Sequence, residues 1–210
     1  CLRDEGFAWP LEGAVLQPLA GMRGFEADEG LLAGALDFSV LLFDLTRDPP
    51  SLRASVPFDE EVRRVILSGG VLFVVTRSGE EARDAVHIVD VSDPARPRRL
   101  PVLTSEVIDA VAVDGSLLFV VSGAALYLID VTAPVDPVML QYVTLPCAVS
   151  EIDASGGISL LACGEKGLFG LNVSDPFHPL LQSLAPVEGL VPGKALGEGG
   201  TWVILGEAAG

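Results

Sequence analysis

The stretch VHIVDVSDPARPRRL, residues 86–100, joins a short apolar strand to a turn with two prolines and then to a second apolar segment. Closely similar text returns as LYLIDVTAPVDPVML at 126–140 and as LFGLNVSDPFHPLL at 168–181. An Asp or Asn at the end of a strand accepts backbone N–H bonds in a turn, and proline fixes the backbone there. The sequence therefore predicts a repeated unit in which a strand turns sharply into an edge strand.

The residue before each turn sets the period of this repeat. Asp44, Asp90, Asp130 and Asn172 occupy the position, at spacings of 46, 40 and 42 residues. A period near 42 is typical of a β-propeller blade, which is a four-stranded antiparallel sheet. Unbroken apolar runs such as LLFVV at 117–121 indicate strands that are buried on both faces. We therefore expect an all-β propeller with four-stranded antiparallel blades.

Four complete units and one incomplete unit follow from this pattern, within a single propeller domain that spans residues 1–210. The units lie at about 24–58, 62–103, 107–145, 149–186 and 190–210. The last unit supplies only two strands, and we expect residues 7–20 to complete it as a fifth blade, because ring closure removes exposed sheet edges. The alternative is a fragment of a longer propeller that is cut after Gly210.

The charge of the chain restricts its partners. Lys and Arg number 13 against 29 Asp and Glu, a formal net charge of -16. Nucleic acids and anionic lipid surfaces both require basic residues, so neither is an expected partner. We expect other proteins as partners, with the charge keeping an apolar, strand-rich chain in solution.

The segments at 86–103 and 126–140, each preceded by LFVV, resemble the LVIVD repeat of bacterial β-propeller proteins. The resemblance covers roughly residues 24–186. It is weaker in the first unit, where DLTRDPP replaces the usual Asp-Val-Ser-Asp-Pro, and in the fourth, where Asn172 replaces Asp. The resemblance implies a scaffold at the bacterial cell envelope or outside the cell, with other envelope or surface proteins as its partners, and it brings no catalytic residues. A lipoprotein subunit fixed in a larger membrane-associated assembly is a form of the same expectation.

Three cysteines are too few and too scattered for a disulfide framework. Cys1, at the start of the sequence, resembles the lipid-bearing residue of a mature bacterial lipoprotein, and the alternative is an arbitrary boundary. Cys163 lies in the apolar strand SLLACG, and our register places Ser150 opposite it. We therefore expect Cys163 to be a buried thiol without a disulfide to Cys147.

Catalysis requires titratable groups that converge. On the innermost strands, at one mouth of the channel, the candidates are Arg63, Arg64, Asp109 and Glu151. This set predicts either a solvated rim of compensating charges or an axial pocket of a hydrolase or lyase. We favour the first and expect a non-enzymatic interaction scaffold.

Motifs for other chemistry are missing. The sequence contains no CxxC, HExxH or GxSxG pattern to accompany His87 or His178, so no metal or other cofactor is expected. The aspartates before the turns are expected to be structural, because one carboxylate per blade does not form a calcium site. Phe177, between two prolines at a turn tip, is a candidate interface residue.

Overall fold

The computed structural model describes residues 22–79, 83–105, 107–184, 190–198 and 201–208. Nearly all of this part of the chain is strand or turn, with one three-residue 3₁₀ helix, η1 (Gly164–Lys166). Within these ranges no helix has the length and apolar character needed to cross a membrane.

Four four-stranded antiparallel sheets follow one another along the chain, each with its strands in sequence order. The first contains β1 (Gly24–Asp28), β2 (Leu31–Leu36), β3 (Ser39–Asp44) and β4 (Ser51–Pro57). The second contains β5 (Glu61–Ser68), β6 (Val71–Arg77), β7 (Asp84–Asp90) and β8 (Arg98–Ser105). The third contains β9 (Ala110–Asp114), β10 (Leu117–Ser122), β11 (Ala125–Asp130) and β12 (Val138–Thr144). The fourth contains β13 (Glu151–Ser155), β14 (Ile158–Ala162), β15 (Leu168–Asn172) and β16 (Leu180–Ser183). A two-stranded sheet of β17 (Leu190–Glu198) and β18 (Thr201–Ala208) follows.

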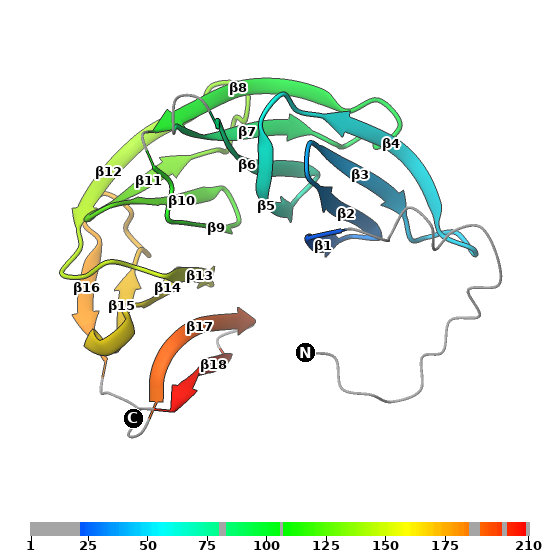
Figure 1. The fold of residues 1–210 in the computed structure, drawn as a ribbon. Coiled ribbons are helices and arrows are strands. Elements are labelled where there is room, and N and C mark those ends of the chain that lie inside the picture. The colour runs from blue at the N-terminus through cyan, green and yellow to red at the C-terminus, as the bar shows by residue number, and fades with distance from the viewer. Residues whose placement is uncertain (1–21, 80–82, 106, 185–189, 199–200, 209–210) are drawn as a thin grey trace.

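The sheets fan around a common centre, with the first strand of each four-stranded sheet innermost and the fourth at the periphery (Figure 1). Arg64 on β5 forms an ion pair with Glu151 on β13, so side chains from the inner strands of the second and fourth sheets reach each other near the centre. The predicted propeller of four-stranded blades is confirmed, and four such blades are present in the described ranges. The fifth-blade closure depends on residues 7–20, which lie outside the described residues, and it stays a prediction.

The hydrophobic core is divided among the spaces between neighbouring sheets. Along β10, Leu118 and Val120 belong to the core between the second and third sheets, whereas Phe119 and Val121 belong to the core between the third and fourth. Alternate side chains of one strand thus enter two different cores. This double burial explains why the strand consists of apolar residues without a polar alternation.

Turns between the first and second strands of a blade form hydrogen bonds to the preceding blade. Gly69 and Gly70 form the turn between β5 and β6, and both have the positive φ that glycine adopts at little cost. Asp28, at the end of β1, accepts a hydrogen bond of 2.8 Å from the Gly69 backbone N–H. Asp114, at the end of β9, accepts a similar bond of 2.7 Å from the N–H of Gly157, the second glycine of the β13–β14 turn. The carboxylates therefore fasten the first sheet to the second and the third to the fourth.

The structure corrects the expectation for Cys147 and Cys163, because the two residues form a disulfide with a Cα–Cα distance of 5.7 Å. The ladder ends at the pair of Glu151 and Ala162, and the Ser150 N–H donates to the Ala162 carbonyl, so the expected pairing of Ser150 with Cys163 is not part of the ladder. The bridge does not cross the β13–β14 ladder. It joins the loop before β13 to the residue after β14, and the sequence pattern did not reveal that approach.

The disulfide predicts the number of free thiols. A recombinant sample without the proposed lipid, denatured in guanidinium without reductant, should react with one equivalent of a thiol reagent, at Cys1, and with three after reduction. The bridge closes a loop of 16 residues, so its loss should lower the free energy of unfolding by about 3 kcal/mol. Three reactive thiols in an unreduced, oxidatively purified sample would show that the bridge does not form.

Candidate functional site

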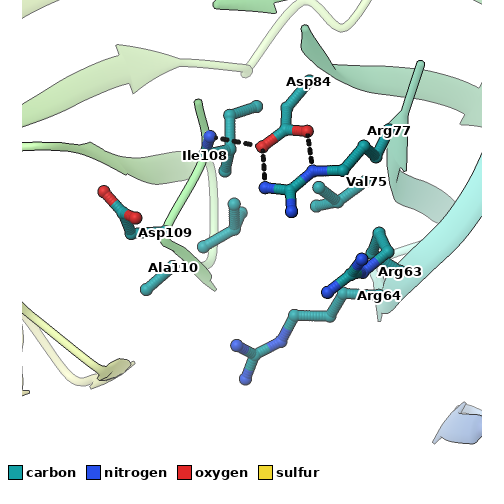
Figure 2. Close-up of a pocket in the computed structure, with 9 residues that line it drawn as sticks. Arg63, Arg64, Val75, Arg77, Asp84, Ile108, Asp109 and Ala110 are labelled. Atoms are coloured by element: carbon teal, nitrogen blue, oxygen red, sulfur yellow. Dashed lines mark hydrogen bonds and ion pairs between the residues drawn. The ribbon is translucent and has the colours of Figure 1, made fainter. Parts of the chain in front are cut away.

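The residues predicted at the channel mouth lie around one pocket between the second and third sheets. Arg63 and Arg64 extend from β5, and Asp109 directly precedes β9 (Figure 2). These three side chains line a cavity of about 180 Å³. Glu151 reaches the same region from β13 through its ion pair with Arg64. The structure therefore places all four predicted residues at the inner ends of neighbouring blades.

The central ion pair of this pocket was not predicted from the sequence. Arg77 Nε and Nη2 donate to the two carboxylate oxygens of Asp84 at 2.8 and 2.9 Å (Figure 2). Asp84 is only 2% exposed and also accepts a hydrogen bond of 2.7 Å from the Ile108 backbone N–H. Since Ile108 leads into the third sheet, Asp84 connects two blades. The sequence feature that could have predicted this ion pair is the register of the β6–β7 hairpin, which places Arg77 opposite Asp84.

The carboxylates around the pocket are already engaged within the chain. Asp84 binds Arg77 and the backbone N–H of Ile108. Asp109 accepts a hydrogen bond of 2.7 Å from the Gly123 N–H, and Glu151 forms an ion pair with Arg64. Burial raises the pKa of Asp84, but the hydrogen bonds from Arg77 and Ile108 and the charge of Arg77 outweigh it, so that the pKa lies below its ordinary value. A general acid at neutral pH needs the opposite shift. Asp84 is held ionised, as in a structural pair.

A second polar cluster surrounds His87 on β7. Its Nε2 lies 2.9 Å from Thr76 Oγ1 and 3.1 Å from Glu60 Oε2, and Thr76 Oγ1 donates to Glu60 at 2.7 Å. The hydrogen bond from Thr76 is the largest cause of a lowered pKa of Glu60. A catalytic relay places the acid and the nucleophile on opposite ring nitrogens. Here both face Nε2 and Thr76 is fully buried, an arrangement typical of structural packing.

The aspartates before the proline turns make the hydrogen bonds expected of them. Asp90 Oδ1 accepts from the Ser92 N–H at 3.0 Å and from its hydroxyl at 2.6 Å. Asp44, Asp130 and Asn172 make equivalent bonds to the backbone N–H two residues later. Within the described ranges, no three His, Cys, Asp or Glu side chains converge as a metal site.

These turns predict a loss of stability in acid. Hydrogen bonds from the following hydroxyl and N–H lower the pKa of Asp44, Asp90 and Asp130 in the folded state. Because the unfolded chain then binds more protons near pH 4, stability is lost as the pH falls through that range. The thermal midpoint should therefore decrease from pH 5 to pH 3.

An asparagine variant provides the control for the acid prediction, because Asn172 shows that asparagine supports the same turn. With Asp90→Asn and Asp130→Asn combined, the midpoint should change less between pH 5 and pH 3 than in the wild type. Protonation also relieves repulsion among the excess acidic groups in both proteins. An equal or larger decrease in the variant would contradict this explanation.

Apolar side chains are exposed at the periphery of the third sheet. On β12, Val138, Met139 and Tyr142 are 52%, 61% and 60% exposed. Phe177, in the β15–β16 turn, is 57% exposed, and its carbonyl accepts a hydrogen bond of 3.3 Å from Gln141 Nε2. The turn therefore lies against β12. We call β12 and Phe177 together the outer-rim surface.

Comparisons with known proteins bear on the fold alone. No family model matches the sequence, and no curated protein matches it. A functionally unknown protein from Desulfotomaculum acetoxidans superposes with a TM-score of 0.71, over 88% of this chain and 62% of its own, at 12% identity. The WD40 repeats of RRP9 superpose with a TM-score of 0.56, over 73% of this chain and 48% of theirs, at 15% identity. A chain of the mitotic checkpoint complex superposes with a TM-score of 0.60, over 83% of this chain and 55% of its own, at 13% identity.

WD40 repeats form propeller blades, so these likenesses agree with the blade architecture described above. The chain spans less than two thirds of the length of each of these three structures. At 12–15% identity they establish the fold and no function.

Proposed function

We propose that this protein is a non-enzymatic scaffold that binds other proteins through the loops and edges of its blades. The outer-rim surface is the observation that carries the proposal. Four of its apolar side chains, Val138, Met139, Tyr142 and Phe177, are more than half exposed, and aromatic and methionine residues in exposed clusters are typical of protein interfaces. The blades hold this surface rigidly because each blade shares a core with its neighbours.

The residues at the channel mouth also support the proposal, because their arrangement does not favour catalysis. A hydrolase or lyase would need carboxylates free to exchange protons with a substrate, whereas Asp84, Asp109 and Glu151 each bind a partner within the chain. The cavity they border is also small, about 180 Å³. Pockets for metabolites usually have volumes of roughly 300–1,000 Å³.

Two of the structural neighbours occur in protein assemblies. One is a chain of the mitotic checkpoint complex, and another is in a complex of Dbp5 bound to Nup159 and Gle1. These assemblies belong to those proteins. For this chain they support only the general use of a propeller for protein binding.

The location at the bacterial cell envelope or outside the cell is a further part of the proposal, together with a lipid on Cys1. Its support is the resemblance of residues 24–186 to the LVIVD repeat and the cysteine at position 1. Mass spectrometry of the N-terminal peptide from native membranes tests it. An acylated Cys1 is expected, and an unmodified peptide would contradict the lipid.

Photo-crosslinking in the native host tests the scaffold function. The reactive residue p-benzoylphenylalanine would replace Tyr142, Phe177, Phe25 or Phe38, one at a time, at exposed aromatic positions of three blades. We expect a discrete protein adduct at Tyr142 or Phe177. If no position gives an adduct, the scaffold proposal fails. An adduct from Phe25 or Phe38 alone would retain the scaffold and move the interface away from the outer rim.

A further inference from the structure

The outermost strands of the four blades differ in how their free edges are protected. On β4 the sequence includes Arg53 and Pro57, and on β8 it includes Arg98, Arg99 and Pro101. The fourth outer strand, β16, has only four residues. Charged residues, prolines and short length all hinder pairing with another strand. β12 has seven residues, VMLQYVT, with no charge and no proline, so its edge alone among these four has no such protection.

The free edge of β12 presents backbone groups to solvent. The Leu145 N–H donates to the Ala124 carbonyl, which makes these two residues a hydrogen-bonded pair. Because hydrogen-bonded and non-hydrogen-bonded pairs alternate in an antiparallel ladder, the backbone N–H and C=O groups of Thr144 and Tyr142 point away from β11. In agreement, the Tyr142 N–H donates to the side-chain oxygen of Gln141 and not to β11.

Both faces beside this edge offer apolar contacts. Met139 and Tyr142 pair with Ile129 and Tyr127, whose side chains pack in the core between the second and third sheets. Their side chains therefore lie on that face of β12. On the other face, Gln141 contacts the turn that carries Phe177. Side chains of an added strand would therefore alternate between two faces. Those on one face would lie beside Met139 and Tyr142, and those on the other beside the turn that carries Phe177.

Charge decides what kind of strand would bind. Asp136 lies two residues before β12, and Asp175 lies in the turn that Gln141 contacts. The single basic side chain of that turn, His178, is bound to Asp175. The whole chain carries a net charge of -16, so a second copy would be repelled while a basic segment would be attracted.

We infer that the free edge of β12 binds an extended apolar segment of a partner protein by strand addition, with Lys or Arg flanking that segment. This inference rests on the proposed scaffold function and specifies its binding mode. Main-chain hydrogen bonds to Tyr142 and Thr144 supply affinity, and the apolar groups on the two faces of β12 select the side chains.

The test uses the full chain and a labelled synthetic peptide, Lys-Lys-Val-Thr-Val-Thr-Val-Thr-Lys-Lys, in a fluorescence anisotropy titration. The test variant is Thr144→Pro, which removes an outward N–H without removing a bond to β11. Pro57 occupies the same register position on β4, so the fold accepts proline there. Thr144→Val is the matched control because it retains the N–H.

We expect saturable binding to the wild type, unchanged within twofold in Thr144→Val and weakened at least tenfold in Thr144→Pro. A peptide with Glu in place of Lys, and one N-methylated at alternate amides, should each bind at least tenfold more weakly. Absence of binding to the wild type, or equal binding of the N-methylated peptide, would overturn strand addition. A dimer in sedimentation that Thr144→Pro dissociates would show that a second copy occupies the edge instead. Each of these failures leaves the crosslinking test of the scaffold function untouched.

Discussion

Replacing Asp84 with alanine is expected to lower the free energy of unfolding by about 3 kcal/mol. The buried carboxylate accepts two hydrogen bonds from Arg77 and one from the Ile108 backbone N–H. Its removal leaves a buried N–H without an acceptor and the Arg77 guanidinium without its partner. The link between the second and third sheets is lost at the same time. Denaturant titrations of wild type and variant measure the difference.

Asp136→Ala is the matched control for this prediction, because Asp136 is an exposed carboxylate in a turn. Its effect should stay within about 0.5 kcal/mol. The double variant of Asp84→Ala with Arg77→Ala should lose less than the sum of the two single losses, since the side chains bind each other. A loss below about 1 kcal/mol for Asp84→Ala, or additive losses, would contradict a structural role for the pair.

Phe119→Ala is expected to destabilise the protein by about 4 kcal/mol. Phe119 is completely buried in the core between the third and fourth sheets, with Leu126, Leu161 and Leu171 in the same cluster. Truncation removes apolar contacts with both sheets and leaves a cavity that the rigid ladders cannot close. The same denaturant titration measures the loss.

Phe25→Ala is the comparison for Phe119→Ala, because Phe25 is 72% exposed on β1. We expect a change within about 0.5 kcal/mol for this variant. Equal losses in the two variants would mean that the cores do not lie between the blades as described.

The repeat in the sequence predicted the blades because it records local chemistry. An Asp or Asn at a strand end, followed by proline, forms the same turn wherever it occurs, and the four turns lie at the ends of β3, β7, β11 and β15. Apolar runs such as that of β10 also predicted strands buried on two faces, as Leu118 and Phe119 show. These features depend on residues that are close in the sequence.

Features that depend on distant segments were not predicted. The disulfide between Cys147 and Cys163 requires the path of a loop, and the bond from Ile108 to Asp84 requires the position of a neighbouring blade. The comparison between the edges of β12 and β4 requires the register of each outer strand with its neighbour. These registers show that Pro57 of β4 and Thr144 of β12 occupy the same position in their blades. The positions of the inner strands predict the residues at the channel mouth, whereas their ion pairs depend on how neighbouring blades approach each other.

Hydrogen exchange measured by mass spectrometry, with and without the Lys-flanked peptide, tests binding at the outer rim most directly. Strand addition predicts slower exchange in the fragment that contains residues 138–145. The outward amide of Thr144 gains an acceptor, and that of Tyr142 exchanges the Gln141 side-chain oxygen for a main-chain acceptor in a ladder. Fragments from β4 and β8 should exchange at unchanged rates. Slower exchange confined to residues 63–77 and 108–111, which border the channel mouth, would place the binding site there and contradict the account.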